Sequence, residues 1–440
     1  MEESWDENEL RRLQKSVSLK RRLEKSGYRE KTTGSSSSTS ATPREGPPVK
    51  KSKIMKKPGG GPAKDTDVNT MDKCLAKVKE GRHEDPIIVG SDCSGIGADM
   101  FAFKLLGIDN RIEHKFASEK DPVTRKTYEA NHTGLNKMYE SCTLDKRPVG
   151  SVPRVTIYVA GPPCQPFSGA GRREGLKDTG SEESGNQNRG TVLLDVIGYI
   201  INRHPKMFLI EEVKGLNTGA AKKLFDKVIN MLQNVSSRGK PLYHVEWRVV
   251  NTFDIGGIPQ NRERIYIAGM WKSLASNSKD IAFEWPGCVR PPKLSHFLKP
   301  NHEPTWMPTA KFHLENLLRL WNGVKENEGQ DPADVMFCFD ISASEKFCGK
   351  WMKEKSPTIT RARAGGGGYY LSAWKRMMST SDICKLQGFP TTLKNGGATD
   401  RQVRQMLGNA MTVTVVARIV RMLLGAAGYI DLDIVADPVE

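Results

Sequence analysis

Short apolar runs that end in glycine or polar residues recur along the chain and predict buried strands. They lie at 87–90, 155–160, 208–210 and 264–268. Helical spacing of apolar side chains follows at 100–106 and again at 413–423. Strands that alternate with helices in this way are typical of an α/β domain with a mostly parallel sheet.

Glycine and a carboxylate follow the first two apolar runs. Ser94-Gly95-Ile96-Gly97 lies between the 87–90 run and the 100–106 helix, and Glu119 ends the apolar segment 116–118. Glycine lets backbone approach a ligand closely, and a helix N-terminus offers free N–H groups. A carboxylate about twenty residues further on can bind ribose hydroxyls. By itself, Glu119 is better explained as a surface acid, and only other support for the site favours the ribose contact.

A cysteine follows the 155–160 run in the segment Gly161-Pro162-Pro163-Cys164-Gln165. The two prolines restrict the backbone, so we expect the Cys164 thiol on a stiff turn at a strand end, where α/β enzymes place their chemistry. A small buried thiol is the ordinary alternative. The polar neighbours favour a nucleophile, and the Gly- and Arg-rich stretch 169–190 is expected to close over a substrate.

Charged residues also mark the next two strands. Glu211 and Glu212 end the 208–210 run, and acids at the end of an apolar strand are costly unless they are satisfied. Arg262 and Arg264 enter the last strand, and their spacing predicts that they share one face. The alternative is an ordinary basic strand.

Composition restricts the class of protein. Of 440 residues, 37% are hydrophobic, the mean hydropathy is −0.51, and no apolar run of about 18 residues predicts a spanning helix. The first residues do not resemble a secretory signal. The eight cysteines show no paired metal-binding spacing and no disulfide framework, so we expect reduced thiols in an intracellular compartment, and no metal.

Charge is concentrated near the N-terminus. The net charge is +16, and residues 11–64 alone contain 16 lysines and arginines against three glutamates. Residues 1–70 contain too few aliphatic side chains to repay the entropy of ordering, so we expect a disordered basic tail. The segment 47–57 fits nuclear import or contact with phosphates, and a solvated linker explains it equally well.

The remaining chain is expected to form two domains. Residues 71–272 together with 381–440 contain the predicted strands and the terminal helix. Residues 273–380 are irregular, contain five tryptophans and a run of four glycines, and are expected to form a smaller domain.

Six segments taken in order resemble the DNA (cytosine-5) methyltransferase family over about 87–425. They are SGIG, GPPCQPFS, EEV, PQNRERIYIAG, LQGFP and GNAM. The PPCQ and QxRxR segments are the specific ones, and six ordered pieces with plausible gaps are hard to obtain by accident.

The resemblance implies a doubly wound, mostly parallel, Rossmann-like sheet that binds S-adenosylmethionine, with 273–380 as a target-recognition domain. It implies DNA methylation at carbon 5 of a flipped-out cytosine. From the segment 47–57 we expect a nuclear location, and we expect a monomer. Cys164 is then the nucleophile, Glu211 acts at the ring N3, and Arg262 and Arg264 lie near the base. The implied cofactor contacts are Ser94, Gly95, Ile96, Gly97, Glu119, Cys142, Asn409 and Met411.

Three departures from the family pattern concern this site. Cys93 replaces the aromatic residue of the first motif, Ser141-Cys142 replaces a segment with an acid, and Glu212 replaces the asparagine of E-N-V. A second carboxylate can raise the pKa of Glu211 or disfavour the Cys164 thiolate, and both remain open. The alternatives are an RNA (tRNA) cytosine methyltransferase, although a Cys-Phe-Thr signature is missing, and a weakly active DNA-binding homologue.

Overall fold

The computed structural model describes residues 85–143, 146–163, 191–237, 239–274, 283–300, 308–342 and 350–439. Three predictions lie outside these ranges: the basic tail with its 47–57 segment, the Cys164 thiol, and the closing loop at 169–190. Pro162 and Pro163, which lead into Cys164, are described.

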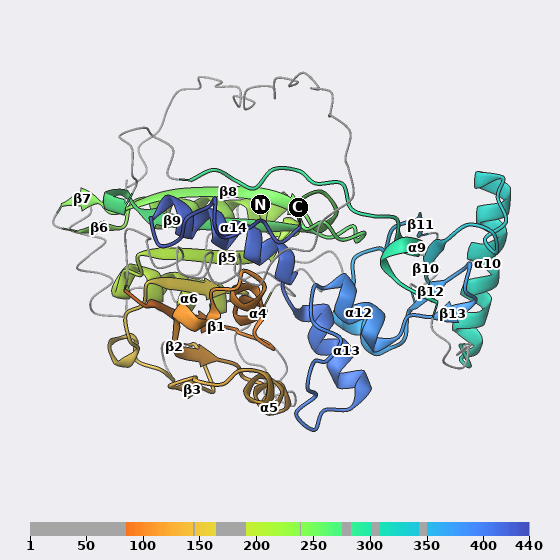
Figure 1. Cartoon of the computed structure of the whole chain (residues 1–440), viewed down its shortest axis with the longest axis horizontal. Helices are drawn as coiled ribbons and strands as arrows, with labels where there is room; N and C mark the ends of the chain where they lie inside the picture. Colours follow the sequence, from red (N-terminus) through yellow and green to blue (C-terminus); the bar gives the residue numbers. More distant parts are fainter. Residues whose placement is uncertain are drawn as a thin grey trace, which may run out of the picture.

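The central feature is a seven-stranded sheet with the order β3-β2-β1-β4-β5-β9-β8 (Figure 1). The first five positions pair in parallel, and β9 and β8 are antiparallel. Its strands are β1 (Ile87–Asp92), β2 (Ile112–Ser118), β3 (Met138–Tyr139), β4 (Ile157–Ala160), β5 (Met207–Val213), β8 (Tyr243–Asn251) and β9 (Glu263–Trp271). The predicted α/β class and mostly parallel sheet are confirmed.

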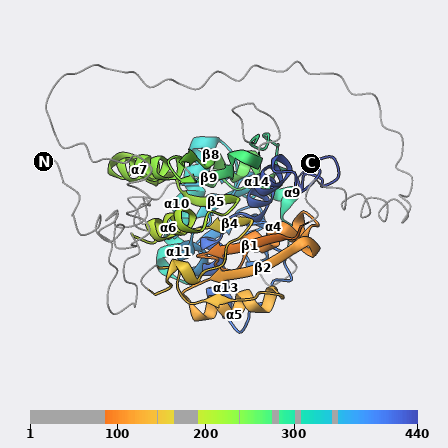
Figure 2. The same cartoon turned by 90° about the vertical axis from the view of Figure 1, so that its left-hand side faces the viewer.

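Helices cover both faces of this sheet, as Figure 2 shows edge-on. One core cluster joins α4 and α14 to the face that carries Val89 and Leu209, and a second joins α6 and α7 to the face that carries Phe208 and Ile210. Strands buried on both faces read as continuous apolar runs, which is why 155–160 and 208–210 were recognisable. The helices are α4 (Ala98–Leu105), α5 (Pro122–Asn131), α6 (Val192–Arg203), α7 (Lys222–Gln233), α8 (Thr252–Ile255) and α14 (Val413–Ala426).

Residues 283–378, expected to be irregular, contain a second sheet with the antiparallel order β11-β10-β12-β13. Leu317, Leu320 and Val324 of the long helix α10 pack on Phe337 and Phe339 of this sheet. The strands of this sheet are two to four residues long, which is too short for a recognisable alternation of apolar and polar residues. The elements are α9 (Leu294–Phe297), α10 (Lys311–Glu328), β10 (Phe337–Asp340), β11 (Trp351–Lys353), α11 (Arg361–Gly365), β12 (Tyr369–Leu371) and β13 (Arg376–Met377).

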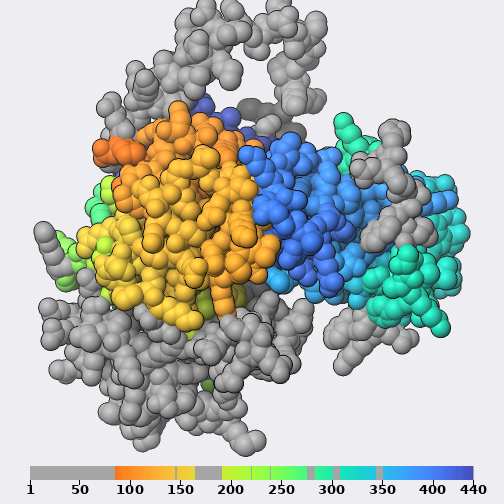
Figure 3. Space-filling view, turned by 90° about the horizontal axis from the view of Figure 1, so that it is seen from below, coloured from red at the N-terminus to blue at the C-terminus, as the bar shows by residue number. Residues whose placement is uncertain are grey.

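The strands of the large sheet all lie before residue 272, and those of the second sheet all lie between 273 and 380. The division of the chain into domains stays a prediction. The first core cluster includes Cys338 and Leu371 of the second sheet, so apolar packing continues from one sheet to the other. Two helices, α12 (Thr380–Leu386) and α13 (Asp400–Asn409), then lead back to α14. In Figure 3 this C-terminal part lies against α5, where Thr127 Oγ1 donates to Asn395 O (2.7 Å).

One stretch of the described chain, Asp400–Ala426, is long and apolar enough by composition to cross a membrane, contrary to the expectation from apolar runs alone. Its most apolar window is 72% buried inside the fold. Ala410, Met411 and Thr412 interrupt the helix, so the stretch consists of the separate helices α13 and α14. This degree of burial is typical of helices in the core of a folded domain.

Candidate active site

The predicted site residues that the structure describes gather at one edge of the large sheet, where the parallel strands end. The loop 93–97 follows β1, Glu119 follows β2, Gly161 follows β4, and Glu211 lies near the end of β5. From β1 the chain moves outward to β2 and β3, and then returns to the other side of β1 with β4. Ligands of such sheets bind at this reversal of strand order.

The loop after β1 is anchored to the end of β2. Ser94 N donates to Ser118 O (2.9 Å), and Ser118 N donates to Ser94 Oγ (3.1 Å). Gly95 N donates to Glu119 Oε2 (3.0 Å), which places Glu119 directly beside the glycine loop. A Cβ added to Gly95 would meet no atom of the described residues within 4 Å, so these residues leave open space beside the loop. The expected proximity of Gly95 and Glu119 is therefore present.

A buried histidine forms a hydrogen bond with the backbone of the same loop. His132 Nε2 donates to Ile96 O (3.0 Å), and burial lowers the pKa of His132 to about 4, so its ring is neutral near pH 7. Gly97 has φ +81°, and a Cβ there would lie 2.3 Å from His132 Nε2. Glycine at 97 is thus required both by the left-handed backbone and by the imidazole.

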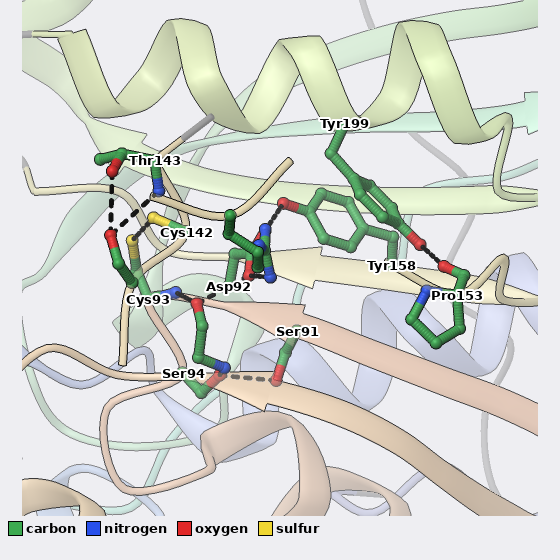
Figure 4. Close-up of polar contacts among 12 residues, drawn as sticks. Ser91, Asp92, Cys93, Ser94, Cys142, Thr143, Pro153, Tyr158 and Tyr199 are labelled. Carbon is green, nitrogen blue, oxygen red and sulfur yellow. Dashed lines mark hydrogen bonds and ion pairs between the residues drawn. The ribbon is translucent and has the colours of Figure 1, made fainter. Parts of the chain in front are cut away.

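A buried ion pair joins the end of β1 to the loop after β3 (Figure 4). Arg147 donates to both carboxylate oxygens of Asp92, at 2.8 and 2.6 Å, and its side chain is 4% exposed. Tyr158 Oη (2.6 Å) and Ser118 Oγ (2.7 Å) also donate to Asp92. Four donors satisfy a charge that would otherwise be very costly to bury. The Arg147 guanidinium also lies 5.0 Å from the ring centre of Tyr139.

We predict that Arg147→Met lowers the free energy of unfolding by about 3–5 kcal/mol, because it leaves Asp92 buried without its cation. Urea unfolding measures the change. Lys222→Met is the matched control, since Lys222 forms an exposed ion pair with Asp226 and such pairs contribute little. The double variant Asp92→Asn/Arg147→Met should recover part of the loss. Equal stability of Arg147→Met and Lys222→Met would contradict this role.

Cys142 and Met411 lie near the loop after β1. Cys142 is 8% exposed, and its Sγ is 3.6 Å from Cys93 Sγ. Met411, from the turn between α13 and α14, approaches Gly161: its Cγ would lie 3.8 Å from a Cβ built there, and Cys93 O would lie 4.0 Å from that Cβ. Met411, 250 positions after Gly161 in the sequence, therefore completes this part of the site. Asn409, at the end of α13, is exposed, and its expected cofactor contact stays a prediction.

Glu211 and Arg264 meet across the antiparallel pair β5 and β9. Arg264 Nε lies 3.0 Å from Glu211 Oε1, and the two side chains are 14% and 9% exposed. A carboxyl group and a cation thus share one small polar region at the same edge of the sheet as the glycine loop. The expected neighbourhood of these two residues is present.

Glu212, where the family has asparagine, is completely buried on the opposite face of β5 from Glu211. Among the described residues its Oε1 has no hydrogen-bond partner, and its Oε2 accepts from Val213 N (3.1 Å). Burial, and then the charge of Glu211, raise the pKa of Glu212 to about 8. Near pH 7 Glu212 is therefore largely a neutral acid, uncharged like the asparagine it replaces but one methylene longer.

We predict that Glu212→Gln flattens the pH dependence of stability. An acid whose pKa is raised on folding stabilises the protein fully below its unfolded pKa, near ~4.3, and loses that contribution as pH rises through the folded value. Glutamine cannot ionise, so it does not lose this contribution. The free energy of unfolding of the variant, relative to that of the wild type, should therefore rise by a few kcal/mol in total between about pH 5 and pH 8.

Urea unfolding across this pH range measures the difference. The matched control is Glu129→Gln, an exposed acid on α5. If the Glu212→Gln curve runs parallel to that of Glu129→Gln, ionisation of Glu212 is not coupled to folding.

Arg262 has different surroundings from Arg264, although equal spacing led us to expect a shared face near the base. Arg262 is 2% exposed, and it donates to Ile359 O (2.7 Å) and Ala410 O (2.8 Å). It precedes β9 rather than belonging to it, so strand alternation does not apply. Its contacts join the QxRxR segment to the GNAM segment and to the loop between β11 and α11. The expected role of Arg262 beside the base stays a prediction.

Several supporting residues escaped the sequence analysis. Asp92 carried a usable signal, because an acid directly after a buried apolar run calls for a partner. Arg147 and His132 carried none, since both come from loops or helix ends without periodicity. Gln260, which donates to Leu386 O (2.6 Å) and accepts from Ile359 N (3.0 Å), lay within a recognised motif but had no assigned role.

Sequence comparisons agree with this geometry. The model of C-5 cytosine-specific DNA methylase matches residues 91–424, which is most of the chain. The chain belongs to this family. Type II methyltransferase M.NgoBI of Neisseria gonorrhoeae is 30% identical over 329 residues, 73% of this chain and 88% of that protein. M.NlaX of Neisseria lactamica is 26% identical over 340 residues, 76% of this chain and 95% of that protein.

Solved structures support the fold of this family member. A protein described as a prophage-encoded DNA modification methyltransferase (E. coli) aligns with a TM-score of 0.51, and a methyltransferase of Entamoeba histolytica aligns with a TM-score of 0.50. Each is 17% identical and covers 77% of this chain and 98% of its own. At that identity the likeness concerns the fold alone.

Proposed function

We propose that this chain transfers a methyl group from S-adenosylmethionine to carbon 5 of cytosine in DNA. One observation supports this reading above the others. The carboxyl of Glu211 and the cation of Arg264 lie 3.0 Å apart at the sheet edge where the glycine loop and Glu119 also lie. Pro162 and Pro163 follow the neighbouring strand β4 at this same edge, and Cys164 is the next residue in the sequence.

The residues around the glycine loop fit S-adenosylmethionine. Glu119 can accept from ribose hydroxyls, because its two oxygens each take one backbone N–H, from Gly95 and Asp121, and keep lone pairs. No described atom lies within 4 Å of a Cβ built on Gly95, and the apolar side chain of Met411 lies beside Gly161. We assign Ser94, Gly95, Ile96, Gly97, Glu119, Cys142, Asn409 and Met411 to this site. When bound, the cofactor supplies an electrophilic methyl group on sulfur.

Cys164 is the proposed nucleophile. Its thiolate adds to carbon 6 of the cytosine and forms an S–C6 bond, which makes carbon 5 electron-rich enough to take the methyl group. A base then removes the carbon-5 proton, and the electron pair restores the C5–C6 double bond as the Cys164 thiolate leaves. The two prolines before Cys164 restrict the backbone that presents the thiol.

Glu211 and Arg264 stabilise the charge that this addition develops. Glu211 is placed to exchange a proton or hydrogen bond with the ring N3, and Arg264 to hold the ring oxygen. Arg262 acts indirectly, because its contacts with Ile359 O and Ala410 O set the approach to β9. Glu212 remains a neutral buried support under the pair near pH 7.

DNA is the proposed substrate, and the target base must leave the stack at a cost of a few kcal/mol. The second sheet and α10, within 273–380, are the proposed target-recognition domain. Backbone phosphates would attract the excess of basic residues, without sequence choice.

We predict that purified full-length protein transfers label from S-adenosylmethionine to carbon 5 of cytosine in mixed-sequence duplex DNA, and that Cys164→Ala abolishes transfer because no S–C6 bond can form. Cys288→Ala, at an exposed cysteine, is the matched control and should keep wild-type turnover. Mapping the methylated cytosines reports activity and sequence context together.

Two further arms separate the alternatives. Transfer to tRNA but not to DNA would favour an RNA substrate. Absence of a covalent adduct with DNA that contains a mechanism-based cytosine analogue would favour a binding-only homologue. Equal incorporation by wild type and Cys164→Ala would refute the nucleophile assignment.

A nuclear location remains a prediction from 47–57, and the bacterial relatives named above do not support it. If the segment is an import signal, deleting 47–57 should shift the full-length chain out of the nucleus of a eukaryotic cell, as fluorescence microscopy would show. An unchanged distribution would leave 47–57 as a linker or a phosphate-binding arm.

A further inference from the structure

Two thiols face each other in the proposed cofactor site. Cys93 Sγ and Cys142 Sγ are 3.6 Å apart, one at the end of β1 and the other in the loop after β3 (Figure 4). Neither residue follows the family pattern at its position. The other free cysteines of the described chain, Cys288, Cys338 and Cys384, show no comparable thiol neighbour.

The buried ion pair holds these thiols together. Cys93 directly follows Asp92, and Cys142 lies five residues before Arg147, whose N–H donates to Thr143 O (2.9 Å). The bond between Asp92 and Arg147 therefore brings together the two segments that carry the sulfur atoms. Cys93 also adopts φ +53°, a left-handed backbone that is uncommon for a residue with a side chain. The surroundings, rather than a local preference, hold Cys93 there.

The two thiols differ in exposure, because Cys142 is buried and Cys93 is only partly so. The hydrogen bond to Cys142 and burial both raise the pKa of Cys93 well above its usual value. Either sulfur can be the donor of the hydrogen bond that joins them. Cys93 is only half-buried, which leaves a route for a small oxidant.

We propose that Cys93 and Cys142 are an oxidation site, at which a hydroperoxide forms a reversible disulfide that blocks the cofactor. One of the two sulfur atoms attacks an oxygen of hydrogen peroxide, which breaks the O–O bond and gives a sulfenic acid and one water. The other sulfur then attacks that sulfenic sulfur, forming the S–S bond and releasing a second water. The two thiols lose two electrons and two protons in total, and the peroxide is reduced. The sulfur atoms must move from 3.6 Å to about 2.05 Å, a shift within reach of side-chain rotation.

The effect on the cofactor rests on the proposed function. Cys142 is itself assigned to the proposed cofactor site, and Cys93 directly precedes Ser94 and Gly95 of that site. A bond between the two sulfur atoms displaces Cys142 and fixes both segments, so it changes the surface that the ligand contacts. Binding and oxidation then oppose each other, because coupling between two binding events is reciprocal. Bound S-adenosylmethionine should accordingly slow formation of the disulfide.

The experiment uses the full-length chain with Cys164→Ser, so that oxidation of the proposed nucleophile cannot affect the result. Protein is treated with hydrogen peroxide, quenched with catalase and alkylated, and its disulfides are mapped by mass spectrometry. Calorimetry measures S-adenosylmethionine binding before treatment, after treatment and after reduction with dithiothreitol. We expect a linked Cys93–Cys142 peptide, and affinity weakened by about tenfold or more and restored on reduction.

Matched variants separate this disulfide from general oxidation. In Cys142→Ser and Cys93→Ser, affinity should not respond to peroxide, whatever its starting value. Cys288→Ser should respond as the parent does, because Cys288 is exposed and outside the site. Absence of the linked peptide overturns the proposal, and so does a linked peptide that leaves affinity unchanged. If untreated protein binds no S-adenosylmethionine, the proposed function fails, while peptide mapping still decides the oxidation site.

Discussion

The ion pair between Asp92 and Arg147 is the contact on which the candidate site depends most. It lies where the first strand ends, is almost fully buried, and connects the glycine loop to the segment that carries Cys142. A buried carboxylate tolerates few arrangements, because every missing donor costs free energy. Tyr158 and Ser118 complete its hydrogen bonds from β4 and β2. Three neighbouring strands are thus held in register around one charge.

The two glutamates at the end of β5 have separate roles because they lie on opposite faces of the strand. Glu211 reaches Arg264 at the edge of the site, whereas Glu212 is enclosed by the core on the other face. An acid at the position of an amide would be harmful as a buried anion. Held neutral near pH 7, it resembles the amide, and this accounts for how the EEV variant is compatible with the fold.

Long-range contacts complete the site. Arg262 and Gln260 bind backbone groups of Ile359, Leu386 and Ala410, and Met411 approaches Gly161. The C-terminal part of the chain thereby joins the sheet that the N-terminal part begins. The Cys93 and Cys142 pair has the same origin, since 49 residues separate two sulfur atoms that lie 3.6 Å apart.

The sequence by itself determined the α/β class, most strands of the parallel sheet, and the neighbourhood of Gly95, Glu119, Glu211 and Arg264. Each depends on local regularities: apolar runs, strand ends and motif spacing. Only the tertiary structure decided that Arg262 holds carbonyl groups, that Arg147 neutralises Asp92, that burial raises the pKa of Glu212, and that a second sheet forms within 283–378. These outcomes depend on burial and on partners distant in sequence, and no local pattern encodes the electrostatic cost of a buried charge or the residue that offsets it.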